Sequence, residues 1–500
     1  MINISLNTQT VLVGVSMGIV VYYVIKRMRY RLPPGPWCIP FVGHYTVYSS
    51  LEVHRKVTEL SKIYGPVVRL CFGSTTMVFL NDVEVVLEAM VKKKADFAGR
   101  PKIASGEMVS EGGKDIIFST YTPTWKFHRR IAGKAIRHYL QGDLLENMIQ
   151  NSMEEFLVKM AQEKEPFSVK NYVDRMVFHQ LYTICFGEKR PIDDPEIEEL
   201  LKLDDDIIED FGVGVLEDIF PYLKDIYPTA KWKRMTDKMN RIMDILRTKF
   251  KQHVDTIEPG VNRDFTDSLL IARQEAENER DEAALEKLDD THLIQTISDI
   301  FLAGVETTRF TMDWFVYFMT KHPEIQSKCQ EEIDRVVGME RPSMKNRDNL
   351  HFIEACIFET LRLGNVAGVG PPHMTICDSQ VGGYDIPKGT IVFINFWALH
   401  HDPKYWKDPE KFDPHRYLDD NDKLKPGKPD SWLPFSAGRR VCLGEIIAKP
   451  EILLMCANLL QRFEISLPDG VKPNLEPKMT GFGVEYPSEY RIIVRQRVVR

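Results

Sequence analysis

The sequence predicts a mainly α-helical fold with a minor β component, preceded by an N-terminal membrane anchor. Asp290 to Lys321 contains no proline and Pro323 follows it, which predicts one helix of about 32 residues and about 48 Å, far above average length. Short runs rich in β-branched and aromatic residues, bounded by glycines, predict two β-hairpins. Residues 10–25 (TVLVGVSMGIVVYYVI) are apolar and uncharged. Hydrophobic residues at 43% and charged residues at 27% indicate a folded globular body.

Residues 10–25 predict the membrane anchor. About 16 residues at 1.5 Å each fall short of a hydrocarbon core of about 30 Å, so a cleaved signal peptide and a buried helix are the alternatives. The basic residues follow the apolar run instead of preceding it, which favours an uncleaved anchor with a lumenal N-terminus and a cytosolic body. They are Lys26, Arg27, Arg29 and Arg31. We assign residues 1–31 to this signal-anchor helix and its basic flank.

A proline-rich segment follows the predicted anchor. Residues 32–36 read LPPGP, and prolines at this density cannot lie inside a helix. They predict a stiff, extended spacer. We assign residues 32–40 to this hinge and residues 41–500 to a single catalytic domain.

The body alternates short strands with longer helices. Residues 65–73 with 76–80 predict one hairpin, and residues 382–389 with 390–394 predict the second. Proline near the start and glycine near the end predict helices over residues 323–337 and 346–363. A last helix is predicted over residues 445–460, with a kink at Pro450.

Charge and cysteine content argue against several classes of function. The net charge is −7, so no overall positive charge favours nucleic acid as a partner. The eight cysteines are scattered without a C-x-x-C pair, which argues against a zinc ribbon or a disulfide framework. Most are expected to be reduced, buried apolar residues, so a reactive one must be identified by its neighbours.

Cys442 is the cysteine with unusual neighbours. Residues 435–444 (FSAGRRVCLG) form the pattern F-x-x-G-x-R-x-C-x-G, and a predicted helix begins directly after them. A sulfur at a helix N-terminus near an arginine is expected to have a lowered pKa, so Cys442 is predicted to be a thiolate that can ligate a metal. The alternative, a buried structural cysteine near a turn, is the commoner role.

This motif resembles that of the haem-thiolate monooxygenases, the cytochromes P-450, and the resemblance covers the chain after the anchor. It implies a b-type haem (iron protoporphyrin IX) within residues 41–500, with Cys442 as the proximal ligand of the iron. Phe435 and Gly438 are then cofactor-binding residues. The family's fold has the long central helix passing over the haem.

Two further segments resemble the family's buried Glu–Arg–Arg cluster. Residues 359–362 (ETLR) place Glu359 and Arg362 at i, i+3 on one helix face, and residues 412–417 (FDPHRY) supply Arg416. The resemblance implies a structural role for these three residues. His415 stands where the family usually has a glutamate.

Other residues resemble the family's partners of the haem propionates. Trp125 and Arg129 form a W-x-x-x-R element at i, i+4, and both are implied to reach one propionate. Arg100, Arg440 and His373 are implied as further partners. A guanidinium suits a carboxylate because it donates paired, charge-assisted hydrogen bonds.

The middle of the long helix contains residues 303–308 (AGVETT). Gly304 costs about 1 kcal/mol in a helix interior and Thr307 can bond back to a carbonyl one turn earlier, so the two predict a loosened helix and a local groove. In the family this groove takes dioxygen, and Glu306 and Thr307 match its proton-relaying acid–alcohol pair. The resemblance therefore implies that Glu306 and Thr307 are catalytic. It favours oxygen insertion over the peroxide rearrangement of haem-thiolate isomerases.

A stripe of basic residues predicts a surface on which an electron donor docks. Lys126, Arg130 and Lys134 recur at i, i+4 and i+8 and suit an acidic partner, with ordinary solvated surface as the alternative. The resemblance to microsomal members implies NADPH–cytochrome reductase as the donor, with a cytochrome b-type protein as a second donor. It also implies a single-pass location in the endoplasmic reticulum membrane.

The substrate is expected to be a lipophilic small molecule. An apolar pocket above the haem is predicted from five residues: Ala303, Gly304, Ile117, Val366 and Val369. The segments DFAGRP, WKFHRRIA, DIFLAGVETT, INFWALHHDP and LLQRFEISLPDG most resemble the steroid 17-alpha-hydroxylase/17,20-lyase branch, so a steroid is expected and a xenobiotic or fatty acid is the alternative.

Two segments complicate the steroid interpretation. The acidic run 204–206 lies where such steroid enzymes hold the substrate's far polar end, although a solvated helix face is the favoured explanation. Residues 363–366 (LGNV) depart from the family's L-R-P-x in a loop that contacts substrate and propionate.

Overall fold

The computed structural model of the chain describes residues 14, 17–18, 29–38, 43–44, 47, 50–72, 75–139, 143–211, 215–364, 366–471, 477–480 and 483–498. The predicted anchor at residues 10–25 therefore lies almost entirely outside the described residues. None of the helices within these ranges is both long and apolar enough to cross a membrane. The division into residues 1–31, 32–40 and 41–500 stays a prediction.

Helices form most of the body, as predicted, with short strands between them. The longer helices are α3 (Val53–Tyr64), α6 (Pro123–Tyr139), α7 (Leu144–Met160), α8 (Val169–Phe186), α9 (Pro195–Phe211), α12 (Ala230–Thr256), α13 (Phe265–Asn278), α15 (Asp290–Lys321), α16 (Pro323–Val336), α17 (His351–Leu363) and α19 (Glu445–Arg462). The short helical segments are α4 (Val83–Leu87), the π-helical η1 (Glu88–Lys92), α5 (Ala104–Val109), α10 (Leu216–Ile219), α11 (Leu223–Ile226), α14 (Glu282–Leu285), η2 (Met344–Asn349), α18 (Phe396–His401), η3 (Pro414–Tyr417) and η4 (Gly438–Arg440). The strands are β1 (Val67–Phe72), β2 (Thr75–Leu80), β3 (His373–Met374), β4 (Ser379–Val381), β5 (Tyr384–Ile386), β6 (Ile391–Ile394), β7 (Phe463–Ser466), β8 (Lys478–Thr480), β9 (Val484–Tyr486) and β10 (Ile493–Gln496).

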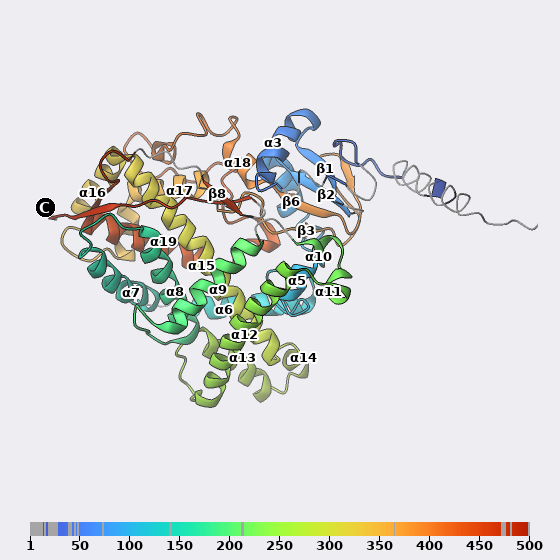
Figure 1. Ribbon diagram of the computed structural model, residues 1–500, viewed down its shortest axis with the longest axis horizontal. Helices are drawn as coiled ribbons and strands as arrows, with labels where there is room; N and C mark the ends of the chain where they lie inside the picture. The colour runs from blue at the N-terminus through green and yellow to red at the C-terminus, as the bar shows by residue number, and fades with distance from the viewer. Residues whose placement is uncertain are drawn as a thin grey trace, which may run out of the picture.

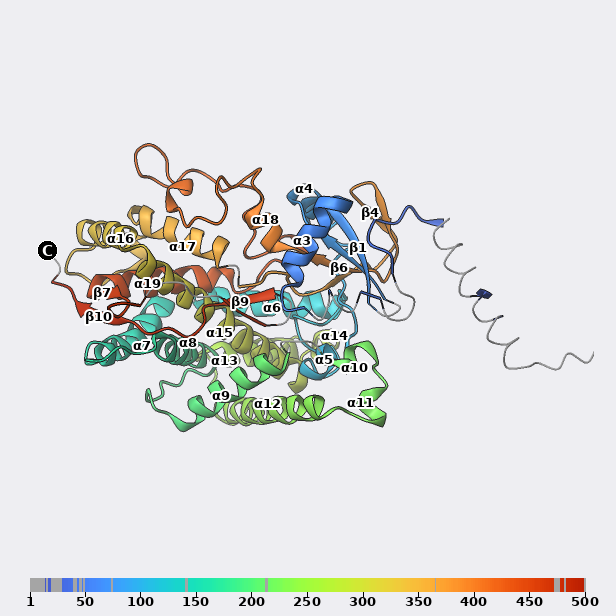
Figure 2. The ribbon, with the colours of Figure 1, turned by 45° about the horizontal axis from the view of Figure 1, so that its top comes forward.

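The long helix α15 crosses the middle of the molecule, with the small sheet and α3 to one side and most other helices to the other (Figure 1). Its bounds are those predicted. The Asp289 carboxylate caps its start by accepting the His292 N–H at 2.8 Å, and Pro323 begins the next helix. Apolar faces of α8, α12, α17 and α19 pack against α15, and α7 packs on α8 and α19, in one large core. Figure 2 shows the same arrangement from a tilted view.

The small sheet has the strand order β1-β2-β6-β3. The predicted first hairpin is confirmed, because β1 pairs antiparallel with β2. The prediction of the second hairpin, residues 382–389 with 390–394, is wrong. Gly382 and Gly383 both have positive φ and form a two-residue turn joining β4 to β5. Residues 391–394 are fully buried and pair in parallel with β2 as the central strand β6.

The predicted helix over residues 346–363 is divided in two. Residues 344–349 form the 3-10 helix η2, and Leu350, with φ −95° and ψ 59°, separates it from α17. The Glu332 carboxylate accepts the N–H groups of Phe352 and Ile353 at 2.9–3.0 Å, which satisfies the first turn of α17. The predicted helix after Cys442 is confirmed as α19, which contains Pro450 and extends to Arg462.

The described part of the proline-rich segment contacts the small sheet. The Arg69 N–H donates to Pro34 O at 2.8 Å, so the segment lies along β1. Arg31 exchanges hydrogen bonds with Asp385 of β5: its N–H donates to the carboxylate at 2.7 Å and its carbonyl accepts the Asp385 N–H at 2.9 Å. Residues 31–34 are thereby held against the body.

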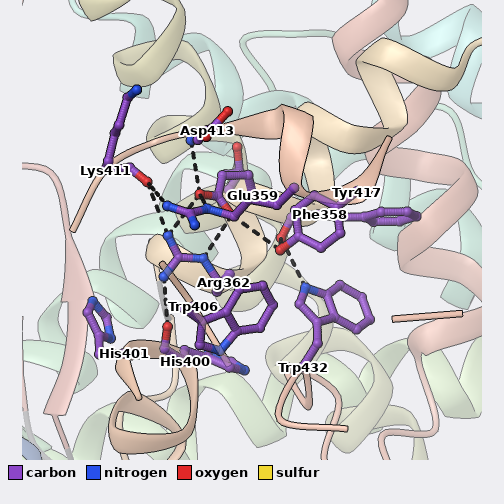
Figure 3. A network of polar contacts seen from close by, with 12 residues as sticks. Phe358, Glu359, Arg362, His400, His401, Trp406, Lys411, Asp413, Tyr417 and Trp432 are labelled. Atoms are coloured by element: carbon purple, nitrogen blue, oxygen red, sulfur yellow. Dashed lines mark hydrogen bonds and ion pairs between the residues drawn. The ribbon is translucent and has the colours of Figure 1, made fainter. Parts of the chain in front are cut away.

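Glu359 joins α17 to the loop between α18 and the Cys442 segment (Figure 3). Its carboxylate accepts two hydrogen bonds from Arg362, both at 2.8 Å, and one from Arg416 Nε at 3.1 Å. Glu359 and Arg362 have fully buried side chains. The two guanidinium groups then donate to backbone carbonyls: Arg362 to His400 O of α18, and Arg416 to Asp408 O of the loop. The structure thus brings together the three residues expected to play a structural role.

We expect Glu359→Gln to destabilise the protein by about 3–5 kcal/mol, because the change leaves the buried Arg362 charge without its counter-ion. Denaturant unfolding followed by circular dichroism measures the loss. Glu410→Gln is the matched control, since the Glu410 side chain is 76% exposed and lies 3.8 Å from His401. It should change stability by less than about 0.5 kcal/mol. Equal effects of the two changes would contradict the anchoring role of Glu359.

Candidate functional site

Cys442 lies in a tight loop between η4 and α19. Its N–H donates to Phe435 O at 2.9 Å, which closes the loop around Gly438. Gly438 has φ +76°, and a Cβ there would lie 1.8 Å from Met90 O, so no other residue fits without moving η1. The glycine and the aromatic residue of the motif therefore fix the path of the backbone that presents the sulfur.

The Cys442 side chain is exposed, yet many protein atoms surround it. This enclosure raises the pKa of the thiol above its ordinary value, while the N–H groups of Gly444 and Glu445 and the charge of Arg129 act in the opposite direction. The predicted lowering is wrong for the thiol itself, because enclosure outweighs the helix N-terminus. A coordinating metal deprotonates a thiol outright, and the two amide donors would then stabilise the thiolate.

Three arginines gather around this loop: Arg100, Arg129 and Arg440. Arg129 donates to Val441 O, directly beside Cys442. The other guanidinium groups also donate to backbone carbonyls. The acceptors are Ile117, Pro371 and Pro372 for Arg100, and Ala98, Ile116 and Ser119 for Arg440. The hydrogen bonds hold the three groups in place but do not neutralise their charge.

The three arginines form a concentration of positive charge with little compensation. Burial, followed by the neighbouring arginines, lowers the pKa of Arg440 to about 8, and burial lowers that of Arg100 to about 10. Among the residues that the structure describes, no carboxylate lies within 4 Å of any of the three, and the charge of Asp115 acts on both Arg100 and Arg440. A buried arginine cluster of this kind is suited to an anionic group, and the two propionates of a haem would supply that charge beside a cysteine ligand.

Trp125 commits its indole N–H to the protein backbone, whereas His373 keeps one ring nitrogen available. The Trp125 indole N–H donates to Ile116 O at 2.8 Å, and its ring stacks against Arg440, whose Cζ lies 4.0 Å from the ring centroid. His373 Nδ1 bonds to Phe97 O at 2.9 Å. Burial, followed by Arg100, lowers the pKa of His373 well below its ordinary range, so the ring is neutral. It has a single uncommitted nitrogen, Nε2, to offer an anion.

Ala303 and Thr307 form an exposed face in the middle of the otherwise buried helix α15. The Thr307 hydroxyl donates to Ala303 O at 2.8 Å, as predicted. The helix is continuous through this turn. Gly304 allows α8 to pack closely against α15, because a Cβ at this position would lie 2.8 Å from Leu181 Cδ1 of α8.

Glu306 is half-buried and faces α9. Burial raises its pKa to about 7, against the effects of Arg309 and of a hydrogen bond with Asp204. Asp204 is 3% exposed, so the interpretation of residues 204–206 as a solvated helix face is wrong for this residue. Its carboxyl group lies 3.2 Å from the buried Arg309. The acid of the predicted acid–alcohol pair therefore belongs to a larger cluster of charges.

The remaining predicted pocket residues lie in different surroundings. Ile117 and Val366 are half-buried. Val369 is 3% exposed and packs with Val57, Leu70 and Phe393 in the core beneath the small sheet. Its side chain is therefore part of that core.

Arg309 is a site residue that the sequence analysis missed. Its side chain is fully buried, and it lies within 4 Å of carboxyl groups on both α8 and α9. A signal was present, since an arginine in the centre of a helix that reads as apolar needs buried partners. The partners themselves are more than 100 residues away and carry no local pattern.

The chain matches the cytochrome P450 family over residues 33–493. It is 36% identical over 478 residues to a steroid 17-alpha-hydroxylase/17,20 lyase of Squalus acanthias, an alignment that covers 93% of this chain and 92% of the relative. A cytochrome P450 1A1 of Cavia porcellus is 33% identical and covers 89% of this chain and 88% of its own. A solved zebrafish cytochrome P450 with progesterone superposes with a TM-score of 0.79 at 31% identity, covering 88% of this chain and 99% of that chain. With its cysteine loop, arginine cluster and central helix, the chain belongs to the cytochrome P450 family of haem-thiolate monooxygenases, oxidoreductases that use dioxygen, a redox partner and a small-molecule substrate.

Proposed function

We propose that this protein hydroxylates a steroid, as a membrane-anchored monooxygenase of the endoplasmic reticulum that receives electrons from NADPH through a reductase. The observation that supports the steroid is the similarity to relatives named steroid 17-alpha-hydroxylase/17,20 lyase, which are 34–36% identical over more than nine tenths of this chain. The progesterone in the zebrafish structure is consistent with it. The relative named cytochrome P450 1A1, at 33% identity, favours a second candidate, a different lipophile such as a xenobiotic or a fatty acid.

The residues of the site have different roles toward a bound b-type haem. When bound, the haem supplies the reductive activation of dioxygen and the oxygen insertion. Cys442 would hold the iron, and Arg100, Arg129 and Arg440 would hold the propionates. Glu306, with a pKa of about 7, can both release and take up a proton near neutral pH. Thr307 presents its hydroxyl oxygen on the exposed face of α15, where it can pass a proton onward.

The exposed face of α6 supports docking of an acidic electron donor. Lys126, Arg130 and Lys134 are all exposed on this helix, and Lys134 has only a distant partner, Glu275 at 3.6 Å. The neighbouring residue Arg129 bonds to Val441 O, so this basic face adjoins the Cys442 loop. Positive charge beside the Cys442 loop favours NADPH–cytochrome reductase, or a cytochrome b-type protein, as the electron donor.

The steroid proposal predicts that progesterone-like steroids shift the haem absorption spectrum towards the high-spin form and are converted to hydroxylated products with reductase and NADPH. Spectral titration followed by mass spectrometry of the products tests this. Lauric acid and a planar aromatic hydrocarbon are the comparison ligands. Turnover of these, with neither a shift nor a product from any steroid, would refute the steroid and favour the second candidate.

Cys442→Ala is expected to abolish the red-shifted Soret band of the reduced, carbon-monoxide-bound protein, because the thiolate ligand is lost. Cys377→Ala is the matched control, since Cys377 is also exposed but lies between β3 and β4. Its spectrum should not change. A retained band in Cys442→Ala would remove Cys442 from the metal site.

Thr307→Ala is expected to raise hydrogen peroxide release per NADPH several-fold, because the exposed face of α15 loses its hydroxyl. Thr307→Ser should retain most coupling. Thr308→Ala is the matched control, because Thr308 is the adjacent threonine but is 3% exposed and faces the core. Peroxide release is compared with product formation in the reconstituted system, and unchanged coupling in Thr307→Ala would contradict the relay.

A further inference from the structure

Residues 115–119, which lie between α5 and α6, hold two of the three arginines beside Cys442. Three of their carbonyl oxygens accept guanidinium N–H groups: Ile116 O and Ser119 O from Arg440, at 3.1 and 2.7 Å, and Ile117 O from Arg100, at 2.8 Å. We call residues 115–119 the arginine-binding loop. The path of this loop sets where both guanidinium groups lie.

Two carboxyl groups hold the N–H groups of the arginine-binding loop. Asp115, within the loop, accepts the N–H groups of Phe118 and Ser119, both at 2.7 Å. Asp299 of α15 accepts the Ile116 N–H at 2.5 Å. The loop therefore turns its N–H groups towards acids and its carbonyls towards arginines, and linked hydrogen bonds of this kind strengthen one another. Asp299 is the acid that comes from another element.

Ile116 is the residue at which α15, the loop and an arginine meet. Its side chain is 5% exposed. Its N–H donates to Asp299, while its carbonyl accepts from both Arg440 and the Trp125 indole. A buried N–H without an acceptor is strongly unfavourable, so without Asp299 the loop would shift until this group found another partner. The Ile116 carbonyl and the groups bonded to it would move with the loop.

Asp299 lies on the side of α15 that carries the exposed face. It precedes Ala303 by one turn and Thr307 by two, and it is half-buried. Burial, followed by the charge of Asp115, raises the pKa of Asp299 well above its ordinary range. Its role as an acceptor does not need a negative charge, because a protonated carboxyl group still accepts through its carbonyl oxygen. An asparagine amide oxygen can therefore replace it.

We propose that Asp299 is a positioning residue for the haem. By holding Ile116 it fixes the arginine-binding loop, and the loop places Arg440 and Arg100 where they reach the propionates. Asp299 acts through the loop and not on the cofactor directly. The contact ties the helix that carries Thr307 to the arginines of the cysteine side. This inference rests on the haem of the proposed function and not on the identity of the substrate.

The test compares haem dissociation from Asp299→Ala, Asp299→Asn and a matched control in the full-length protein loaded with haem. Transfer of haem to excess apomyoglobin measures the rate. Asp299→Ala removes the acceptor and is expected to accelerate haem loss about tenfold, as when a residue that orients a ligand is lost. Asp299→Asn keeps an acceptor oxygen and should stay within about twofold of the wild type.

Glu332→Ala is the matched control. The Glu332 carboxylate also accepts buried N–H groups, those of Phe352 and Ile353 at 2.9–3.0 Å, but it does so between α16 and α17. Its loss should lower stability and change haem dissociation by less than about twofold. If Glu332→Ala accelerated haem loss as much as Asp299→Ala, general destabilisation would explain both results and the positioning role would be overturned.

Resonance Raman spectroscopy reports the contacts of the propionates themselves. The propionate bending band should shift in Asp299→Ala, because the arginines are displaced, and should stay in place in Asp299→Asn and Glu332→Ala. Hydrogen–deuterium exchange over residues 115–119 should be faster in Asp299→Ala alone. An unshifted band in Asp299→Ala, or an equal shift in Asp299→Asn, would overturn the proposal. If Asp299→Ala does not fold, Asp299→Leu takes its place with the same expectations, since leucine fills the space of the carboxyl group but accepts no hydrogen bond.

This proposal and the proposed function fail in different ways. Neither haem transfer nor the Raman band needs substrate, NADPH or a reductase. If the wild type oxidises no lipophile, the proposed function fails, and these two measurements still decide the role of Asp299. If the wild type turns over and Asp299→Ala behaves as the wild type, the positioning role fails and the proposed function stands.

Discussion

The enclosure of three like charges beside one cysteine is the constraint on which the site depends. Arg100, Arg129 and Arg440 converge from three separate parts of the chain, and backbone carbonyls orient them without neutralising them. Like charges held together at low dielectric repel one another, so burial and the neighbouring arginines together lower the pKa of Arg440. The rest of the fold keeps them there. The Glu359 cluster secures the loop that leads to Cys442, and Gly438 allows that loop to pass close to Met90.

The two sides of the site have opposite excesses of charged groups. On the cysteine side, positive charge is in excess, and it suits a dianionic cofactor and an acidic electron donor. On the α15 side, carboxyl groups are in excess, and burial raises the pKa of Asp204 and of Glu306. A segment between the two joins them: Ile116 donates its N–H to Asp299 of α15, while its carbonyl accepts from Arg440 and Trp125.

Local sequence signals predicted the parts of the fold that local physics determines. A proline-free stretch gave the bounds of α15, and a glycine-bounded run of β-branched residues gave the β1–β2 hairpin. The second hairpin was wrong because Ile391–Ile394 pairs with a strand some 300 residues earlier, a choice made by burial and not by the adjacent turn. The motif located Cys442. It did not predict that the pKa of the thiol is raised, because that shift depends on how many protein atoms surround the sulfur. Arg309 and its contact with Asp204 escaped prediction for the same reason, since only tertiary packing brings α8 and α9 to α15.

The buried position of Arg309 has a consequence for how this chain can change over time. Losing Arg309 first would leave Asp174, Asp204 and Asp205 facing one another without their shared cation, which is strongly destabilising. Losing one of the acids first leaves a cation that still has other partners. Viable substitutions in this cluster therefore have a preferred order, with the acids of α8 and α9 changing before the arginine of α15. Lineages that carry the arginine should accordingly vary more freely in the number of acids around it than in the arginine itself.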